Sequence, residues 1–163
     1  MTDRVLVLLR HAKAEHPAKL ADVDRPLTPR GHADSGAAGA WLASQGLVPD
    51  LVLCSPSRRT RDTWHSVKLA LGVRTKPVFD PRLYDGTVAE MVELVSETAS
   101  NVDTVLVIGH NPALSTLSAV LDPAGGPPDG LRTCGLAVHR MTGEWSGTGQ
   151  GAVPLVTVHT ARA

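Results

Sequence analysis

Short apolar runs alternate with helix-like stretches along the first two-thirds of the chain. Val5–Leu9, Leu51–Cys54 and Thr104–Ile108 are short, continuous and apolar or β-branched. Such runs are typical of strands that are buried on both faces of a parallel sheet. Between them, apolar residues recur at helical spacing. Strands that alternate with helices in this way predict an α/β domain with a largely parallel sheet.

Start and stop signals predict four helices. The first begins at Thr28-Pro29, which combines a capping residue with proline at the first helical position, and Gly46 follows its end. Residues 58–71 form the second, with apolar residues on one stripe. The third begins with a capping box, Thr87–Glu90, and the fourth opens at Pro112.

The last third of the chain predicts two more strands. Asp122–Gly130 is rich in proline and glycine and is expected to be a surface loop. Leu136–Val138 and Val153–Val158 follow as strands, with a turn region over Met141–Gly151. These strands are close enough in sequence to pair antiparallel. We therefore expect one domain over residues 1–163, a three-layer α/β/α sandwich whose mostly parallel central sheet has an antiparallel C-terminal part.

Composition narrows the possible partners. Sixteen basic and sixteen acidic residues give a formal net charge of zero, which argues against a general nucleic-acid binder and requires any anion site to come from local clustering. The two cysteines, Cys54 and Cys134, are far apart and fit a reducing compartment. The apolar run at Val5–Leu9 is too short for a signal peptide or a membrane span. We expect a cytoplasmic protein that binds neither nucleic acid nor membrane.

Polar residues with the same chemical theme follow each of the three predicted parallel strands. The first strand runs into Arg10-His11, the second into Ser55–Arg59 and the third into Gly109–Pro112. Ligands of open α/β sheets bind beyond the carboxyl ends of the strands. A single histidine or arginine in a loop is usually an ordinary solvated group. Three strand ends with histidines and arginines together indicate a functional site.

These segments resemble the histidine phosphatase superfamily, the phosphoglycerate-mutase-like proteins. Leu9–Ala12 is similar to its Arg-His-Gly signature, and Ser55–Thr63 is similar to its Ser-Pro-x-x-Arg-Ala-x-Gln-Thr block. Arg25–Gly31 and Gly109–Pro112 match its Leu-Thr-x-x-Gly helix start and its second-histidine motif. The chain is most similar to the small SixA-type phosphohistidine phosphatases, because the short connection 71–87 leaves no room for the lid of larger members.

The resemblance implies a phosphatase of phosphoglycerate-mutase-like fold in which His11 is the nucleophile. Arg10 and Arg59 would bind the phosphate, and His110 would be a further donor. His11 must be neutral to attack, and two nearby arginines lower the pKa of a histidine. The chain departs from the motifs at Ala12, which replaces glycine, and at positions 60 and 62, where Thr and Asp replace Ala and Gln. Alanine is the smallest substitute, so we expect the site to survive.

Three further residues are weaker site candidates. Asp85 lies where larger relatives carry a general acid, but a turn residue beside Gly86 is an equal alternative. Arg25 would touch the phosphate or the incoming protein, or is a surface charge at a helix entry. Asn111 begins the fourth helix, whose free backbone N–H groups could add to the anion site.

The sequence therefore predicts a metal-independent phosphatase that forms a phosphohistidine at His11 and dephosphorylates phosphohistidine on a partner protein. It predicts no cofactor and no metal, because His11 and His16 with the aspartates at 22 and 24 match no known metal spacing. Two alternatives stay open, a phosphomonoesterase for a small metabolite and a non-catalytic module that binds phosphate or phosphohistidine. An open site without a lid favours a protein substrate.

Overall fold

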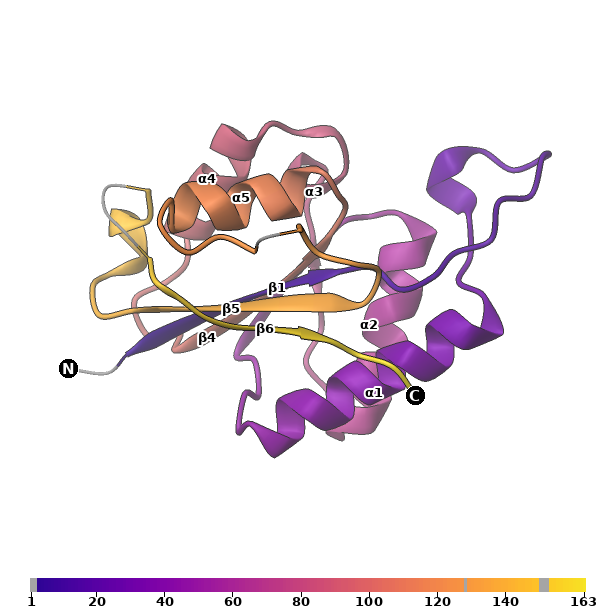
Figure 1. The fold of residues 1–163 in the computed structure, drawn as a ribbon, viewed down its shortest axis with the longest axis horizontal. Coiled ribbons are helices and arrows are strands. Elements are labelled where there is room, and N and C mark those ends of the chain that lie inside the picture. Colours follow the sequence, from indigo (N-terminus) through magenta and orange to yellow (C-terminus); the bar gives the residue numbers. More distant parts are fainter. Residues whose placement is uncertain (1–2, 128, 150–152) are drawn as a thin grey trace.

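The protein is a six-stranded sheet covered by helices on both faces (Figure 1). This computed structural model describes residues 3–127, 129–149 and 153–163. The strand order is β3-β2-β4-β1-β5-β6, in which β3, β2, β4 and β1 run parallel, β5 is antiparallel to β1, and β6 is antiparallel to β5. The strands are β1 (Arg4–Arg10), β2 (Leu51–Cys54), β3 (Val78–Phe79), β4 (Thr104–Gly109), β5 (Gly135–Met141) and β6 (Leu155–Thr160).

Two apolar cores lie on opposite faces of this sheet. Val5, Val7 and Leu9 of β1 point into one core, and Leu6 and Leu8 point into the other, as the two-residue period of a strand requires. Figure 1 shows one pair of helices below the sheet and the remaining helices above it. The lower pair is α1 (Pro29–Ser44) and α2 (Arg58–Leu71); the others are α3 (Arg82–Asp85), α4 (Val88–Ser96) and α5 (Ala113–Leu121). The predicted three-layer arrangement is confirmed.

The helix boundaries follow from the capping residues. The Thr28 hydroxyl accepts a hydrogen bond from the Gly31 N–H at the start of α1. Gly72 ends α2 in the left-handed region at φ 72°, which glycine adopts without steric cost. The predicted capping box between Thr87 and Glu90 is present at the start of α4. No described helix combines the length and the apolar character that a membrane crossing requires.

The structure differs from the sequence prediction in the short elements. The edge strand β3 and the one-turn helix α3 were expected as a plain connection, because two and four residues are too few to show a period. The last strand begins at Leu155 rather than at Val153. The predicted turn over 141–151 contains a 3₁₀ helix, Trp145–Gly147, and its positions 150 and 151 lie outside the described residues.

Candidate active site

The carboxyl ends of β1, β2 and β4 meet at one edge of the sheet. The His11 N–H donates to the Gly109 carbonyl, and the Ser55 N–H donates to the Ile108 carbonyl, both at 3.0 Å. The turns that follow the three strands are therefore held side by side. They border a cavity of about 330 Å³, whose lining includes the predicted residues Arg10, His11, Arg25, Arg59, His110 and Asn111.

His11 presents one ring nitrogen to this cavity in a form suited to nucleophilic attack. Its Nδ1 lies 2.7 Å from the Ala12 carbonyl oxygen. This contact keeps the proton on Nδ1, so the lone pair is on Nε2. Burial lowers the pKa of His11 to about 4; the bond to Ala12 opposes this shift, and the charges of Arg59, Arg10 and Arg25 add to it. His11 is therefore neutral at pH 7.

Ala12 fits where the family motif has glycine. It is fully buried in the core under α1 and α2, and its N–H donates to the Thr63 hydroxyl at 3.1 Å. Thr63 in turn donates to the Arg59 carbonyl. Thr63, the last residue of the motif in α2, thus fixes the backbone beside His11.

Arg10 and Arg59 reach the cavity with part of each guanidinium already engaged. Arg10 Nη1 donates to the Leu131 carbonyl at 3.0 Å. Arg59, which is only 7% exposed, donates through Nη1 and Nη2 to the backbone oxygen and the carboxylate of Asp22, at 2.8 and 3.0 Å. The Nε atoms of both arginines are buried and have no hydrogen-bond partner within the described part of the chain.

In His110, likewise, one ring nitrogen is hydrogen-bonded and the other has no partner among the residues described. Its Nε2 lies 2.8 Å from the Ser55 hydroxyl, and the Ser57 N–H donates to that same oxygen. When the Ser55 hydroxyl donates to Nε2, the ring proton of the neutral imidazole is on Nδ1. Burial, with Arg59 and His11, lowers the pKa of His110 to about 3. Nδ1 is buried without a partner among the residues described, and the ring centroid lies 5.3 Å from that of His11.

Asp22 is a site residue that the sequence analysis considered only as a metal ligand and set aside. Its carboxylate accepts from the Tyr84 hydroxyl at 2.7 Å and from Arg25 and Arg59 at 3.0 Å each. These contacts, led by Tyr84, hold the pKa of Asp22 well below its usual range. The Tyr84 ring also meets the His110 ring edge-on at 5.5 Å. Asp22 is thus an ionised carboxylate that orients Arg59. The one sequence signal for a charged contact of Asp22 is its distance of three positions from Arg25.

Asp85 is not brought to the cavity. It is exposed at the end of α3, and it does not line the cavity. The residue before it, Tyr84, is the one that turns toward the site. The proposed acid role of Asp85 stays a prediction, and the geometry does not favour it. Within the described segments, no three potential metal ligands lie close enough together to hold an ion.

Arg25 and Asn111 both line the cavity. Arg25 donates to the Glu15 carbonyl and to Asp22, which ties the segment between β1 and α1 together. Asn111 donates to the Leu131 carbonyl at 2.6 Å and accepts from the Ser115 N–H. Arg10 donates to the same carbonyl oxygen, so this oxygen holds the side chains of Asn111 and Arg10 in place together. No sequence pattern points to Leu131, because it contributes a main-chain oxygen, which every residue type carries.

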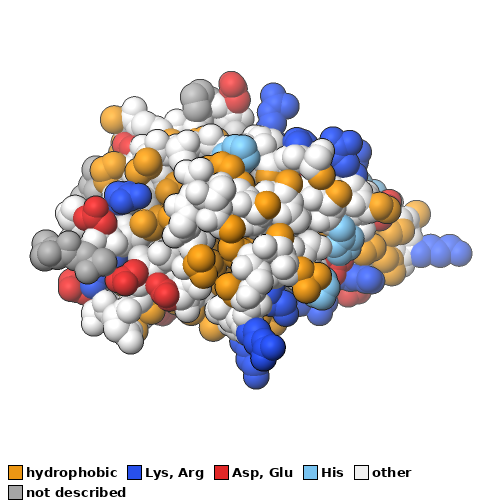
Figure 2. Space-filling view, turned by 90° about the horizontal axis from the view of Figure 1, so that it is seen from below, with side chains coloured by type: hydrophobic (Ala, Val, Ile, Leu, Met, Phe, Trp, Pro, Cys, Tyr) orange, Lys and Arg blue, Asp and Glu red, His pale blue; other side chains and the backbone are white. Residues whose placement is uncertain are grey.

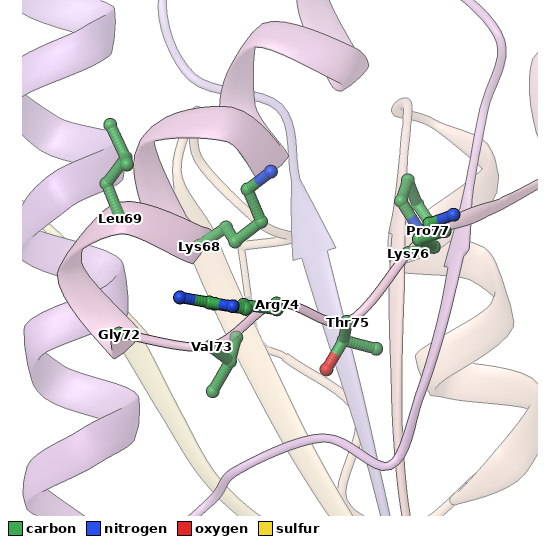
Figure 3. Close-up of a pocket in the computed structure, with 8 residues that line it drawn as sticks. All are labelled: Lys68, Leu69, Gly72, Val73, Arg74, Thr75, Lys76 and Pro77. Carbon is green, nitrogen blue, oxygen red and sulfur yellow. The ribbon is translucent and has the colours of Figure 1, made fainter.

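A larger hollow, of about 490 Å³, lies elsewhere (Figure 3). It is formed by the end of α2 and the segment that leads into β3, and its charged residues are Lys68, Arg74 and Lys76. The segment enters β3, which is parallel to β2, so this hollow is at the amino edge of the sheet. It contains none of the histidines or strand-end residues.

Comparison with known proteins defines the class of this α/β protein, which is a phosphatase. The family model of the histidine phosphatase superfamily (branch 1) matches residues 6–99. The chain is 35% identical to an uncharacterised protein of Mycobacterium tuberculosis, over 94% of this chain and all of that one. It is 32% identical to phosphohistidine phosphatase SixA of Escherichia coli, over 74% and 76% of the two chains.

Solved structures agree with this class. A SixA-type protein from Nakamurella multipartitia superposes with a TM-score of 0.88 at 32% identity, over 100% of this chain and 99% of that one. A tungstate complex of the protein histidine phosphatase SixA gives 0.83 at 28% identity, over 96% of both chains. This chain belongs to the histidine phosphatase superfamily.

Proposed function

We propose that this phosphatase acts without a metal, through a phosphohistidine at His11, and removes phosphate from phosphohistidine on a protein. One observation carries the proposal. Three buried nitrogen atoms, Arg10 Nε, Arg59 Nε and His110 Nδ1, have no partner among the residues described, and all three belong to side chains that line the cavity together with His11. Buried donors are nearly always paired, so this cluster indicates a ligand with several acceptor oxygens.

A phosphoryl group supplies those acceptors. Its transition state spreads negative charge over three oxygens, which planar arginine donors stabilise without any reorganisation. In the proposed reaction, His11 Nε2 attacks phosphorus while the bond to the leaving group breaks. Water then attacks phosphorus and forms a P–O bond while the P–Nε2 bond breaks, so its electron pair returns to Nε2 and the proton that water loses leaves with the phosphate. Asp22 stays ionised and keeps Arg59 aimed at the oxygens.

The lining of the cavity supports phosphohistidine as the substrate. Among its described residues there is no carboxyl group, and the nearby Asp22 is held ionised by its partners. An alkoxide leaving group needs a proton from an acid, whereas the imidazole that leaves a phosphohistidine needs that help least. The similar SixA structure holds tungstate, a tetrahedral oxyanion like phosphate. Two free cysteines fit a cytoplasmic setting for this reaction.

Steady-state kinetics on three substrates tests the proposal. The purified protein is assayed with a phosphohistidine-bearing protein, an aryl phosphate and an alkyl phosphate, each with and without EDTA. We expect the highest kcat/KM on phosphohistidine, the lowest on the alkyl phosphate, and no effect of EDTA. Faster turnover of a small phosphomonoester would assign the enzyme to metabolite hydrolysis, and full loss in EDTA restored by a divalent ion would contradict the mechanism.

A further inference from the structure

A second hollow borders the catalytic cavity. It measures about 480 Å³ and is lined by Lys13, Arg30, Asp34, Thr133 and Arg162. Lys13 and Thr133 also line the catalytic cavity, so the two hollows are neighbours that share these two residues. The backbone fixes this junction, because the N–H of residue 134 donates to the carbonyls of both residues 10 and 11.

Lys13 has a fixed backbone position between the two hollows. Its carbonyl oxygen accepts from the Thr28 N–H at 2.9 Å. A Cβ atom at Gly31 would lie 2.2 Å from this oxygen, so only glycine permits the close approach of α1. The Lys13 side chain is exposed and makes no ion pair within the described residues. Its ammonium group is therefore available at the junction.

Asp34 is the buried residue in the lining of the second hollow. It is 3% exposed, accepts from the Ala163 N–H at 2.9 Å, and lies 3.4 and 3.8 Å from nitrogens of Arg30 and Arg162. The two arginine side chains are 63% and 39% exposed. The buried carboxylate thus anchors two guanidinium groups, while the groups that face solvent are cationic. Figure 2 shows the wider pattern, with lysines and arginines gathered toward the end of the molecule at which β1 ends.

We propose that this second hollow is an anion subsite that binds acidic side chains next to the phosphohistidine of a protein substrate. The inference rests on the proposed function. With a phosphoryl group held by Arg10 and Arg59 in the first hollow, Lys13 and Thr133 give the chain that carries it a path into the second hollow. An acidic segment matches the charge of this second hollow, and electrostatic complementarity of this kind favours association.

Two synthetic phosphohistidine peptides test the subsite, one with glutamates on both sides of the phosphohistidine and one with glutamines. For the natural chain at low salt we expect a preference of about tenfold in kcat/KM for the glutamate peptide, the size expected of two partly screened ion pairs. The double variant Arg30→Gln/Arg162→Gln should lose this preference through KM, with kcat unchanged. Salt at 0.5 M should weaken the preference of the natural chain, because exposed charges are screened.

Three controls separate binding from folding. Arg30→Lys/Arg162→Lys keeps both charges and should keep most of the preference. Lys68→Gln/Arg74→Gln removes two cations from the hollow at the amino edge and should change nothing. The Gln/Gln variant should hydrolyse an aryl phosphate at the natural rate, which shows that the catalytic cavity is intact.

The outcomes distinguish the subsite from the function on which it rests. Equal hydrolysis of both peptides by the natural chain, or the same preference in the Gln/Gln variant, would overturn the subsite alone. Hydrolysis of neither peptide, with turnover of small esters, would overturn the proposed function as well. A preference for a bisphosphorylated small molecule, lost in the Gln/Gln variant and absent for the glutamate peptide, would contradict a protein ligand.

Discussion

Two cationic hollows lie at opposite edges of the same sheet, and they differ in what holds their charges. The amino-edge hollow is the larger, but Arg74 and Lys76 are exposed there, and Lys68 lies in the last turn of α2. Lysine at this place balances the negative end of the helix dipole. The carboxyl-edge cavity instead holds Arg59 at 7% exposure, with a donor atom left unpaired. The histidines and arginines that three strand ends bring together, rather than size or charge count, distinguish the site.

The largest effect that tests this comparison is the loss of a buried arginine. Arg59→Ala should lower kcat/KM by about 3–4 kcal/mol, or roughly 10²–10³-fold, by analogy with the removal of an oxyanion-hole donor, and Arg10→Ala should behave similarly. Arg58→Ala is the matched control, since Arg58 is 53% exposed and faces Asp62 at 3.7 Å. Steady-state assays of Arg58→Ala and Arg74→Ala should match the natural chain. A greater loss at Arg58 than at Arg59 would show that the wrong arginine has been assigned.

The next effect concerns the carboxylate that orients Arg59. Asp22→Asn keeps the shape of the side chain and the backbone bond to Arg59, but it removes the charge. We expect kcat/KM to fall by a factor that corresponds to about 1.5–3 kcal/mol, the size of a hydrogen bond to a charged group. The loss should be equal for aryl phosphate and phosphohistidine substrates, because both use the same phosphate site. A loss confined to substrates with poor leaving groups would make Asp22 an acid instead of a positioning residue.

The pH profile tests the state of the nucleophile. The pKa of His11 is lowered to about 4, so its neutral form is complete above about pH 5 and disappears as the pH falls through 4. We expect kcat/KM on an aryl phosphate to decline only below about pH 5. Arg25→Gln removes one of the charges that lower this pKa and should move the acid limb upward. A limb near the ordinary histidine pKa of 6.5 in the natural chain would contradict a buried, neutral His11.

The smallest effect is expected at Asp85. The side chain is exposed and away from the cavity, so Asp85→Asn should change turnover less than about twofold on either an aryl or an alkyl phosphate. Tyr84→Phe is the informative neighbour, because it removes a bond to Asp22, and it should cost more. A selective loss of alkyl phosphate hydrolysis in Asp85→Asn would assign the acid role to this residue after all.

The sequence was sufficient where local rules determine the structure. Buried parallel strands are recognisable as unbroken apolar runs. Capping residues such as Thr28 and Thr87 bond to the first turn of the helix that follows them, so they mark where it begins. The strand ends were therefore placed correctly, and so were Arg10, His11, Arg59 and His110 at one edge. The topology of an α/β sheet brings these positions together independently of the length and conformation of the loops.

The remaining site contacts depend on tertiary structure. Asp22 begins a single-turn 3₁₀ helix, Asp22–Asp24, which is too short to show a sequence period. Its partners Arg59 and Tyr84 are 37 and 62 positions away in the sequence. Leu131 contributes only its carbonyl oxygen, which no sequence pattern records. Asp85 was a candidate acid because of its place in the sequence, but the turn of α3 brings its neighbour Tyr84, and not Asp85, into contact with Asp22 and His110. Which side chain of a short helix contacts the site depends on tertiary packing, and a single sequence does not show that packing.

Trapping the phosphorylated enzyme tests the central claim most directly. The protein is mixed with substrate, quenched without acid during turnover, digested and mapped by mass spectrometry. We predict a phosphate on His11 that is stable in base and labile in acid, as a P–N bond should be, and His11→Ala should lose both the adduct and turnover. His110→Ala should form the same adduct on His11, more slowly. A phosphate on His110, Cys54 or Ser55, or near-normal turnover by His11→Ala, would contradict the account.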